Sequence, residues 1–274
     1  MPQKVAECVS LKVVAPGVTE VAFVMSAASQ APLRFEAGQF IFLNIPEIAS
    51  LEFHPFTVSA SPLDAHSTCH IKAVESEAQF TSKLHQLALD YEGRLGLPAV
   101  HVDGPYGLPL DFTAHTSLLL VGGGIGITPL HSILRTIVLL QEAGQLGAAC
   151  RLRSVRLVWA AKDPALLAVF RDTFSRVARA KSLSDAASSR KPRLADISVE
   201  LFCPLAGDAG EEVNPIPTTA GRMDLDKEVE TMLRGGFGGD RPLVFVCGPE
   251  SLVKEAARAA TERDVEVHSE TFLL

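Results

Sequence analysis

Residues 116–140 read TSLLLVGGGIGITPLHSILRTIVLL, and this apolar stretch constrains the fold more than any other part of the chain. Its composition resembles that of a membrane span, which needs about 20 apolar residues in one helix. Four glycines interrupt it, and each costs a helix about 1 kcal/mol relative to alanine. Thr128 and Pro129 are typical of a helix start, as the capping residue and the first helical residue. We therefore expect a buried strand, a glycine turn and then a helix.

A strand, a glycine turn and a helix together gather backbone N–H groups and a positive helix end at one point, which favours a phosphate. The spacing Gly122-x-Gly124-x-Gly126 departs from the GxGxxG dinucleotide pattern, and no Lys-Ser/Thr pair follows as in a P-loop. Taken alone, the turn fits a dinucleotide site, a methyltransferase loop or a plain tight turn between strand and helix.

The first part of the chain has the pattern of short strands. Alternating, β-branched and aromatic segments are separated by turn compositions, and one helical pattern lies among them. Strands are predicted at 8–14, 18–25, 38–45, 53–60, 68–75 and just before 103–107, with a helix at about 80–90. This pattern predicts a six-stranded antiparallel barrel over residues 1–113.

From residue 114 strands alternate with helices, which predicts a parallel sheet covered on both faces. The strands are predicted at 117–121, 155–160, 196–202, 242–247 and 265–272. The helices are predicted up to 142 and at 164–180, 225–234 and 249–263. Segments near 181–194 and 205–222 are rich in Ser, Ala, Gly, Pro and Asp, so we expect mobile loops there. Residues 114–274 are thus the expected second domain.

Charge and cysteine usage exclude several classes of function. The net charge is −7 and no run of Lys and Arg occurs, so nucleic acid is not an expected partner. The five cysteines form no CxxC pair and are odd in number, which argues against a disulfide framework and a zinc or iron–sulfur site. A reducing, cytosol-facing location fits this usage, and the N-terminus lacks the apolar segment of a signal peptide. No metal site is expected, and the scattered histidines are interpreted as ordinary surface or core residues.

Four further motifs narrow the choice: HPFTVSAS at 54–61, DGPYG at 103–107, FVCGPESLV at 245–253 and VHSETF at 267–272. Ligands of open α/β sheets bind at the carboxyl ends of strands, so the glycine turn and the CGP segment can border one site. With these motifs in this order, the chain resembles the ferredoxin–NADP reductase superfamily. Within it, the chain is most similar to the C-terminal dehydrogenase domain of NADPH oxidases and ferric reductases. The resemblance covers nearly the whole chain.

The resemblance implies an FAD-binding barrel followed by a Rossmann-like NADP-binding domain. In such barrels the HPFT strand holds the FAD, with the aromatic residue packed on the flavin and the hydroxyl residue near flavin N5. A lysine and a helix start hold the pyrophosphate, and a terminal aromatic stacks over the flavin. The corresponding FAD residues here are His54, Pro55, Phe56, Thr57, Lys72, Phe80, Thr81 and Phe272. Glu77 and Ala78 stand where relatives usually have glycine.

The resemblance also implies an NADPH site. Its residues here are Gly122, Gly123, Gly124, Gly126, Thr128 and Pro129 for the pyrophosphate, Lys162 and Arg222 for the 2′-phosphate, and Cys247, Gly248 and Pro249 near the nicotinamide. Lys162 stands where relatives have arginine, so it offers a point charge without the bidentate fork. The residues implied to act in catalysis are Thr57, Cys247, Glu270 and Phe272.

The activity implied is hydride transfer from NADPH to FAD, followed by single-electron transfer to a haem in a membrane domain. Oxygen or ferric iron is then the final acceptor, and this chain is the dehydrogenase domain at the cytoplasmic face. A transmembrane haem domain in the same full-length chain is the expected partner. A soluble NAD(P)H–flavin oxidoreductase or the reductase component of an oxygenase would share the fold. A nucleotide-binding regulatory module without hydride transfer is the alternative from another class.

Overall fold

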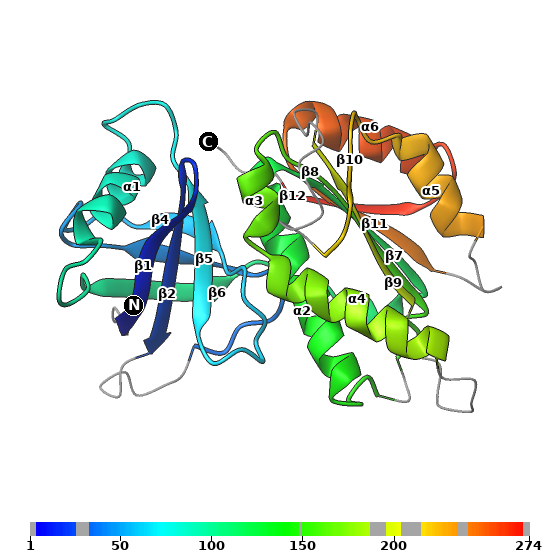
Figure 1. Ribbon diagram of the computed structural model, residues 1–274, viewed down its shortest axis with the longest axis horizontal. Helices are drawn as coiled ribbons and strands as arrows, with labels where there is room; N and C mark the ends of the chain where they lie inside the picture. The colour runs from blue at the N-terminus through cyan, green and yellow to red at the C-terminus, as the bar shows by residue number, and fades with distance from the viewer. Residues whose placement is uncertain are drawn as a thin grey trace. The chain divides into compact units, whose positions relative to one another are not determined.

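The structure is a computed structural model, and it contains two compact units (Figure 1). It describes residues 4–25, 33–147, 150–186, 196–203, 215–234 and 241–270, without the side chains of 181–186. Unit 1 comprises Met1–Leu110 with His131–Ile133 and Leu274. Unit 2 comprises Asp111–Leu130 and Leu134–Leu273. Each unit is described by itself.

Unit 1 is built on a six-stranded antiparallel sheet in the order β4-β3-β6-β1-β2-β5. Its elements are β1 (Lys4–Ala15), β2 (Val18–Met25), β3 (Phe40–Asn44), β4 (His54–Thr57), β5 (Ser67–Lys72), α1 (Phe80–Tyr91) and β6 (Val100–Tyr106). Just past β4, the Ser59 N–H donates to the Thr68 carbonyl at 2.8 Å, so the chain leaving one edge strand joins the other edge strand. The sheet therefore curls round on itself, and the predicted antiparallel barrel is confirmed.

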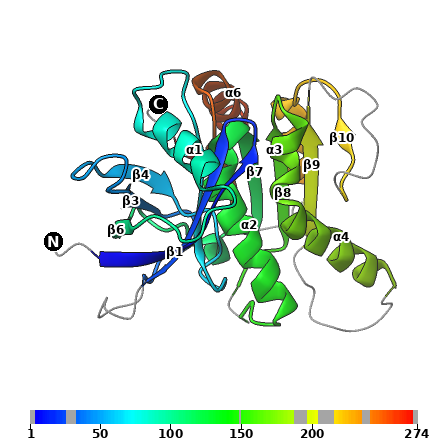
Figure 2. The ribbon, with the colours of Figure 1, turned by 60° about the vertical axis from the view of Figure 1, so that its left-hand side comes forward.

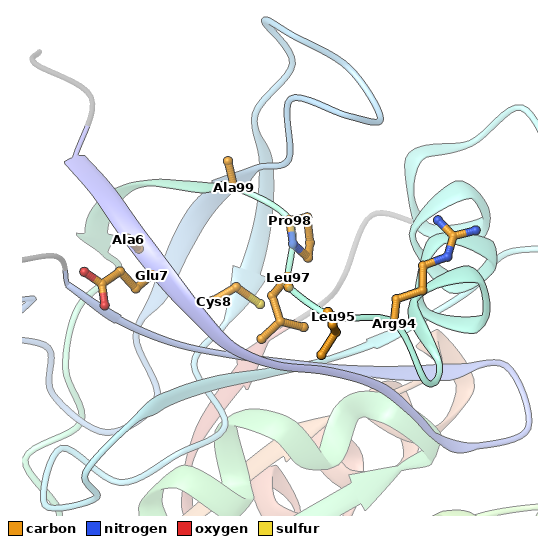
Figure 3. A pocket seen from close by; sticks show the side chains of 9 residues that line it. Ala6, Glu7, Cys8, Arg94, Leu95, Leu97, Pro98 and Ala99 are labelled. Atoms are coloured by element: carbon orange, nitrogen blue, oxygen red, sulfur yellow. The ribbon is translucent and has the colours of Figure 1, made fainter.

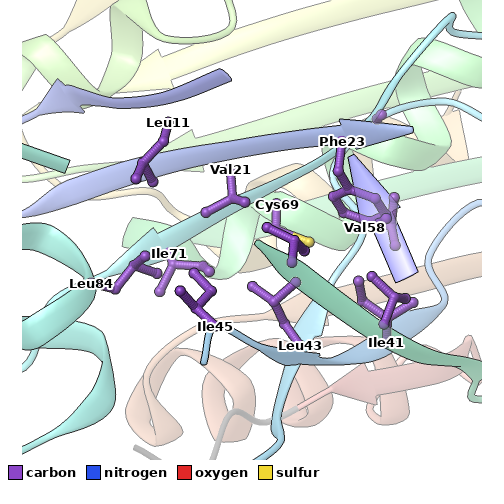
Figure 4. Packing of buried hydrophobic residues seen from close by; sticks show 14 of the residues in the cluster. Leu11, Val21, Phe23, Ile41, Leu43, Ile45, Val58, Cys69, Ile71 and Leu84 are labelled. Carbon is purple, nitrogen blue, oxygen red and sulfur yellow. The ribbon is translucent and has the colours of Figure 1, made fainter. Parts of the chain in front are cut away.

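The core of unit 1 follows from the alternation of its strands. Ile41 and Leu43 on β3, Val21 on β2 and Cys69 on β5 are fully buried, whereas Phe42 between the first two and His70 next to Cys69 are half-buried. Leu84 of α1 joins them, and Figure 4 shows these side chains converging in the curled sheet. The helix thus buries one face, with Phe80, Leu84 and Ala88, against the curled sheet.

Unit 2 is built on a parallel sheet in the order β10-β9-β8-β7-β11-β12. Its strands are β7 (Ser117–Gly123), β8 (Ser154–Ala160), β9 (Asp196–Phe202), β10 (Thr218–Thr219), β11 (Pro242–Cys247) and β12 (Glu266–Glu270). Every residue of β7 is buried, as expected for a central strand covered on both faces. The predicted parallel sheet is confirmed.

Helices cover both faces of this sheet, as Figures 1 and 2 show. They are α2 (Ile127–Glu142), α3 (Pro164–Ala168), α4 (Arg171–Ala186), α5 (Leu225–Arg234) and α6 (Glu250–Thr261), and short 3-10 turns lie at Phe112–Ala114 and Gly124–Gly126. On one face, Leu119 and Val244 pack with α5 and α6. On the other, Trp159 contacts the rings of Phe170 and Phe174.

The helix predicted over 164–180 is wrong in extent. It is two helices, α3 and α4, and the second runs on to Ala186. The interruption places Phe170 against Trp159, edge to face, with ring centroids 5.8 Å apart. Residues 181–186 are therefore helical where a loop was predicted. The remaining predicted loop residues 187–194 and 205–214 lie outside the described residues, and 215–222 contains the short strand β10.

The start of α2 also differs from the prediction. The chain enters a 3-10 turn at Gly124, and α2 begins at Ile127 with Gly126 as its cap. Thr128 is therefore inside the helix, where its hydroxyl donates to the Ile125 carbonyl at 3.2 Å. Pro129 is the third helical residue, and its missing N–H costs nothing because N–H groups of the first turn have no intrahelical partner.

The segment 124–142 is the one part of the described chain long and apolar enough to cross a membrane. Within this segment, 67% of the most apolar 18-residue stretch is buried, as expected of a core helix packed on a sheet. The strand, glycine turn and helix predicted from this stretch are confirmed.

Candidate functional site

The first candidate site lies on β4 of unit 1, where HPFT meets the start of α1. Phe80 is the first residue of α1 and is 5% exposed. Its ring stacks on the imidazole of His54 at 4.3 Å between centroids and lies 6.0 Å from the ring of Phe56. Three of the predicted FAD residues therefore form one aromatic group. His54 also lies 3.3 Å from the carboxylate of Glu52.

The remaining predicted FAD residues surround this group. Thr57 ends β4 and is 6% exposed, whereas Pro55 is exposed. Lys72 ends β5 and is exposed, so its ammonium is available to an anion. The hydroxyl of Thr81 accepts from the Val74 N–H at 3.3 Å, so this side chain holds the segment before α1. Phe272 lies outside the described residues.

The start of α1 offers backbone N–H groups rather than side chains. Its capping residue, Gln79, makes no side-chain cap, and the first turn carries no acidic residue. Such a helix end fits an anion such as a pyrophosphate. Among the described residues Asp264 is the one non-glycine residue with a positive φ, so the loop at Glu77 and Ala78 forms without the glycine common in relatives.

The second candidate site lies in unit 2, where β7 and β11 run side by side and Cys247 pairs with Gly122. A Cβ on Gly126 would overlap the carbonyl of Cys247, and one on Gly123 would lie 2.7 Å from Pro249 Cδ. Glycine at these two positions therefore allows the turn to contact the CGP segment directly. The glycine turn and CGP meet at the carboxyl ends of their strands, as predicted.

Gly124 differs from its neighbours, because a Cβ there would meet nothing within 4 Å. Its φ is +55°, and its carbonyl accepts from the Trp159 indole N–H at 2.9 Å. The start of α2 has no side-chain cap and no acidic residue in its first turn. Open space beside Gly124 and an uncapped helix start fit a phosphate group, so this part of the turn is suited to a dinucleotide.

Cys247 and Glu270 are partners across β11 and β12. Burial, and then the nearby Glu270 charge, raise the pKa of the Cys247 thiol far above its usual value. The thiol is thus neutral, and the carboxylate of Glu270 lies beside it. The His268 imidazole lies 3.9 Å from that carboxylate. A neutral, weakly polar surface next to a hydrogen-bond acceptor can orient a flat ring that carries an amide. Gly248 and Pro249 continue from Cys247 towards α6.

The two predicted phosphate cations follow strands on one side of the sheet. Lys162 comes just after β8 and Arg222 just after β10, and both are exposed. Because β8, β9 and β10 are parallel neighbours, both residues lie at the carboxyl edge. The carboxylate of Asp163, next to Lys162 in the sequence, caps α3 by accepting from the Ala165 N–H at 2.8 Å.

Two contacts at these sites were not predicted from the sequence. Trp159 holds the glycine turn through its indole N–H, although the sequence shows it only as a strand residue. His70, interpreted from the sequence as ordinary, lies 2.7 Å from the Ser59 hydroxyl just past HPFT. Each contact joins a strand residue to a residue outside that strand, and no local pattern reveals it.

A surface depression of unit 1 lies elsewhere (Figure 3). It is lined by Ala6–Cys8 on β1 and by residues 94–99, and Leu95 in it is fully exposed. None of the predicted cofactor residues that the structure describes lines it, so it is separate from the described part of the candidate FAD site.

Comparison with known families identifies two domains in the chain. Residues 6–110 match a family model described as an FAD-binding domain. Residues 115–261 match the ferric reductase NAD binding domain. The first match contains HPFT, and the second contains the glycine turn and CGP.

Curated relatives align over part of the chain. A superoxide-generating NADPH oxidase heavy chain of Dictyostelium discoideum is 38% identical over 116 residues, covering 37% of this chain and 16% of that protein. Ferric reduction oxidase 2 of Arabidopsis thaliana is 30% identical over 190 residues, covering 69% of this chain and 24% of that protein. The chain thus matches about a quarter or less of the length of these two relatives.

Solved structures share the fold at low identity. A ferredoxin NADP+ reductase from Neisseria gonorrhoeae, with bound FAD and NADP, has a TM-score of 0.64 at 13% identity and 98% coverage of both chains. A flavohemoglobin from Malassezia yamatoensis has a TM-score of 0.67 at 15% identity, covering 99% of this chain and 60% of that one. The ferredoxin reductase-like fold is therefore confirmed. The chain belongs to the ferric reductase NAD binding domain family and joins that domain to an FAD-binding domain in one oxidoreductase module.

Proposed function

We propose that this chain is the dehydrogenase domain of an NADPH oxidase or ferric reductase. The observation that carries the proposal is the meeting of the glycine turn, Cys247 and Glu270 at one edge of the parallel sheet. A phosphate-binding turn and a ring-orienting pair are what a nicotinamide dinucleotide needs at its two ends. The FAD-binding family match in unit 1 supplies the second redox partner.

When bound, the nicotinamide supplies a hydride, and the flavin accepts it and releases electrons one at a time. The residues of this chain hold and orient both groups. The neutral Cys247 thiol presents an uncharged surface, and Glu270 accepts a hydrogen bond from a carboxamide. Thr57 lies at the end of the HPFT strand, where its hydroxyl serves as a hydrogen-bond partner for the flavin. Because the cofactors carry the chemistry, this role is one of positioning.

Phosphate recognition distinguishes the dinucleotides. Gly124 and the start of α2 bind the pyrophosphate, while Lys162 and Arg222 bind the 2′-phosphate that NADPH has and NADH lacks. In unit 1, Lys72 and the start of α1 hold the pyrophosphate of FAD, and Phe56 packs against its ring system. Phe272 is proposed to stack over the flavin.

The electrons leave singly to a haem-bearing membrane domain of the same enzyme, with the chain at the cytoplasmic face of that membrane. Oxygen or ferric iron is the final acceptor. The names of the relatives support this proposal, since they are a superoxide-generating oxidase and a ferric reduction oxidase. Their matched parts cover 16% and 24% of their lengths, which leaves room for such a domain.

The test supplies a one-electron acceptor in place of the haem domain. Chain saturated with FAD should reduce ferricyanide with NADPH, and omission of FAD should abolish the reaction. Lys162→Ala should raise the KM for NADPH by about tenfold and leave that for NADH unchanged, since one charge-assisted contact is lost. Lys254→Ala, which removes an exposed lysine of α6, is the matched control and should change neither. Absence of FAD-dependent reduction would contradict the proposal.

A further inference from the structure

A row of polar side chains in contact with one another crosses unit 1 near the HPFT strand. The Ser59 hydroxyl lies 2.7 Å from His70 Nδ1, and His70 Nε2 lies 3.6 Å from the carboxylate of Glu20. Glu20 is paired with the Lys12 ammonium at 3.1 Å and accepts from the Ser10 hydroxyl at 3.3 Å. This row of side chains therefore connects residues of β1, β2 and β5 to Ser59, two residues after the end of β4.

Within this row of side chains, the charge of Glu20 is compensated by its neighbours. Burial would raise the pKa of Glu20, but contacts with His70 and Lys12 outweigh it and hold the pKa at about 2. Glu20 is thus a carboxylate at neutral pH, and His70 lies between it and Ser59. Because the Ser59 hydroxyl donates its one hydrogen to the Thr68 carbonyl, it is available to His70 Nδ1 as an acceptor.

A serine, a histidine and a carboxylate in this order resemble a hydrolytic triad, but burial argues against that role. Ser59 is 1% exposed and the side chain of His70 is 7% exposed. The Ser59 hydroxyl also lies 2.9 Å from the Thr68 carbonyl, within the sheet. No substrate reaches this oxygen, so the group must act on the structure around it.

At Ser59 the main chain changes its hydrogen-bond partner from the segment beside β3 to β5. The Val58 N–H donates to the Gln39 carbonyl beside β3, whereas the Ser59 N–H donates to Thr68 on β5. Thr57, proposed to contact the flavin, lies two residues earlier. A side chain that fixes Ser59 therefore fixes the end of the strand that carries HPFT.

We propose that His70 is a positioning residue for the FAD site, acting through the Ser59 hydroxyl to hold residues 54–59 in the conformation that the structure shows. The inference rests on the proposed FAD site. His70 is an imidazole on β5 that links a buried hydroxyl on one side to a carboxylate on the other, so each side can be tested separately.

The variants at position 70 separate the two sides. The amide of asparagine reaches the place of Nδ1 and the amide of glutamine the place of Nε2. His70→Asn keeps the contact with Ser59, while His70→Gln keeps the contact with Glu20 and His70→Leu keeps neither. Loss of one hydrogen bond should weaken FAD binding about three- to tenfold in the Gln and Leu variants and leave the Asn variant within about twofold.

Two measurements are made on each variant of the full chain. Fluorescence titration gives the Kd for FAD, and hydrogen exchange without FAD gives the exchange rates of the Val58 and Ser59 N–H groups. Exchange at these two amides should accelerate about three- to tenfold in the Gln and Leu variants. His101→Leu is the matched control, since His101 is a half-buried histidine of β6 whose Nδ1 lies 3.1 Å from Asn44 Oδ1. It should leave both amides unchanged.

Equal FAD affinity and equal exchange in wild type and His70→Leu would overturn the inference. So would an Asn variant as impaired as the Gln variant, since that result assigns the effect to Glu20 or to general stability. If the wild-type chain binds no FAD, the proposed function fails, and the exchange rates at Val58 and Ser59 still decide whether His70 holds the strand.

Discussion

At the scale of single residues, the glycines of the turn are needed for different reasons. A side chain at position 126 would overlap the Cys247 carbonyl, so glycine there allows β11 to pack against the turn. Gly124 has a positive φ, which favours glycine, and open space beside it, so no neighbouring atom requires glycine there. The sequence shows both simply as glycines of one motif, and the neighbour of each is known from the three-dimensional structure alone.

Alanine at position 124 should separate backbone strain from ligand binding. Gly124→Ala has a cost of about 1–2 kcal/mol in stability, because alanine disfavours a φ of +55°. Gly144→Ala should cost about the same, since Gly144 has a φ of +66° and nothing within 4 Å. The KM for NADPH should rise at least tenfold in Gly124→Ala and stay unchanged in Gly144→Ala. Equal KM values in the two variants would show that Gly124 does not contact the dinucleotide.

At the scale of elements, strands and helices were largely predictable and their interruptions were not. Buried β7 reads as a continuous apolar run, and the alternation of β3 marks its inner face. The break between α3 and α4 was missed because the helical pattern runs through it, and the packing of Phe170 on Trp159 of β8 is a tertiary contact that periodicity does not show. The contact of His70 with Ser59 was missed for the same reason.

An ion cluster on the sheet of unit 2 is a second feature that pattern alone did not reveal. Arg156 of β8 binds Glu228 of α5 and Glu200 of β9, each at 2.5 Å. The Glu228 side chain is 3% exposed, so its carboxylate is paired with this arginine largely out of contact with solvent. The cluster ties α5 to the sheet face that it covers.

Removing one charge from this cluster should be costly. Glu228→Gln leaves the Arg156 charge partly uncompensated, and we expect a loss of about 3 kcal/mol in the free energy of unfolding, measured by urea denaturation. Lys254→Gln breaks an exposed pair with Glu250, whose side chains are 74% and 78% exposed, and should stay within about 0.5 kcal/mol of wild type. If Glu228→Gln lowers the free energy of unfolding no more than Lys254→Gln does, the stability of α5 does not depend on the Arg156–Glu228 pair.

At the scale of the whole molecule, the order of motifs was more informative than any one of them. The glycine turn by itself left a methyltransferase loop and a plain turn open, whereas HPFT before it and CGP after it indicated two cofactors. The family matches to an FAD-binding domain and a ferric reductase NAD binding domain confirm that pairing. The roles of individual residues, Phe272 among them, stay predictions.

The central claim is that this chain carries hydride from NADPH to its own FAD. The most direct measurement is anaerobic stopped-flow of the FAD-saturated chain with NADPH deuterated at one or the other face of nicotinamide C4. We predict loss of the flavin absorbance near 450 nm (about that of free flavin), slowed severalfold by the label on one face alone, because a bound nicotinamide presents a single face. No loss of absorbance, or equal rates with both labels, would contradict the claim.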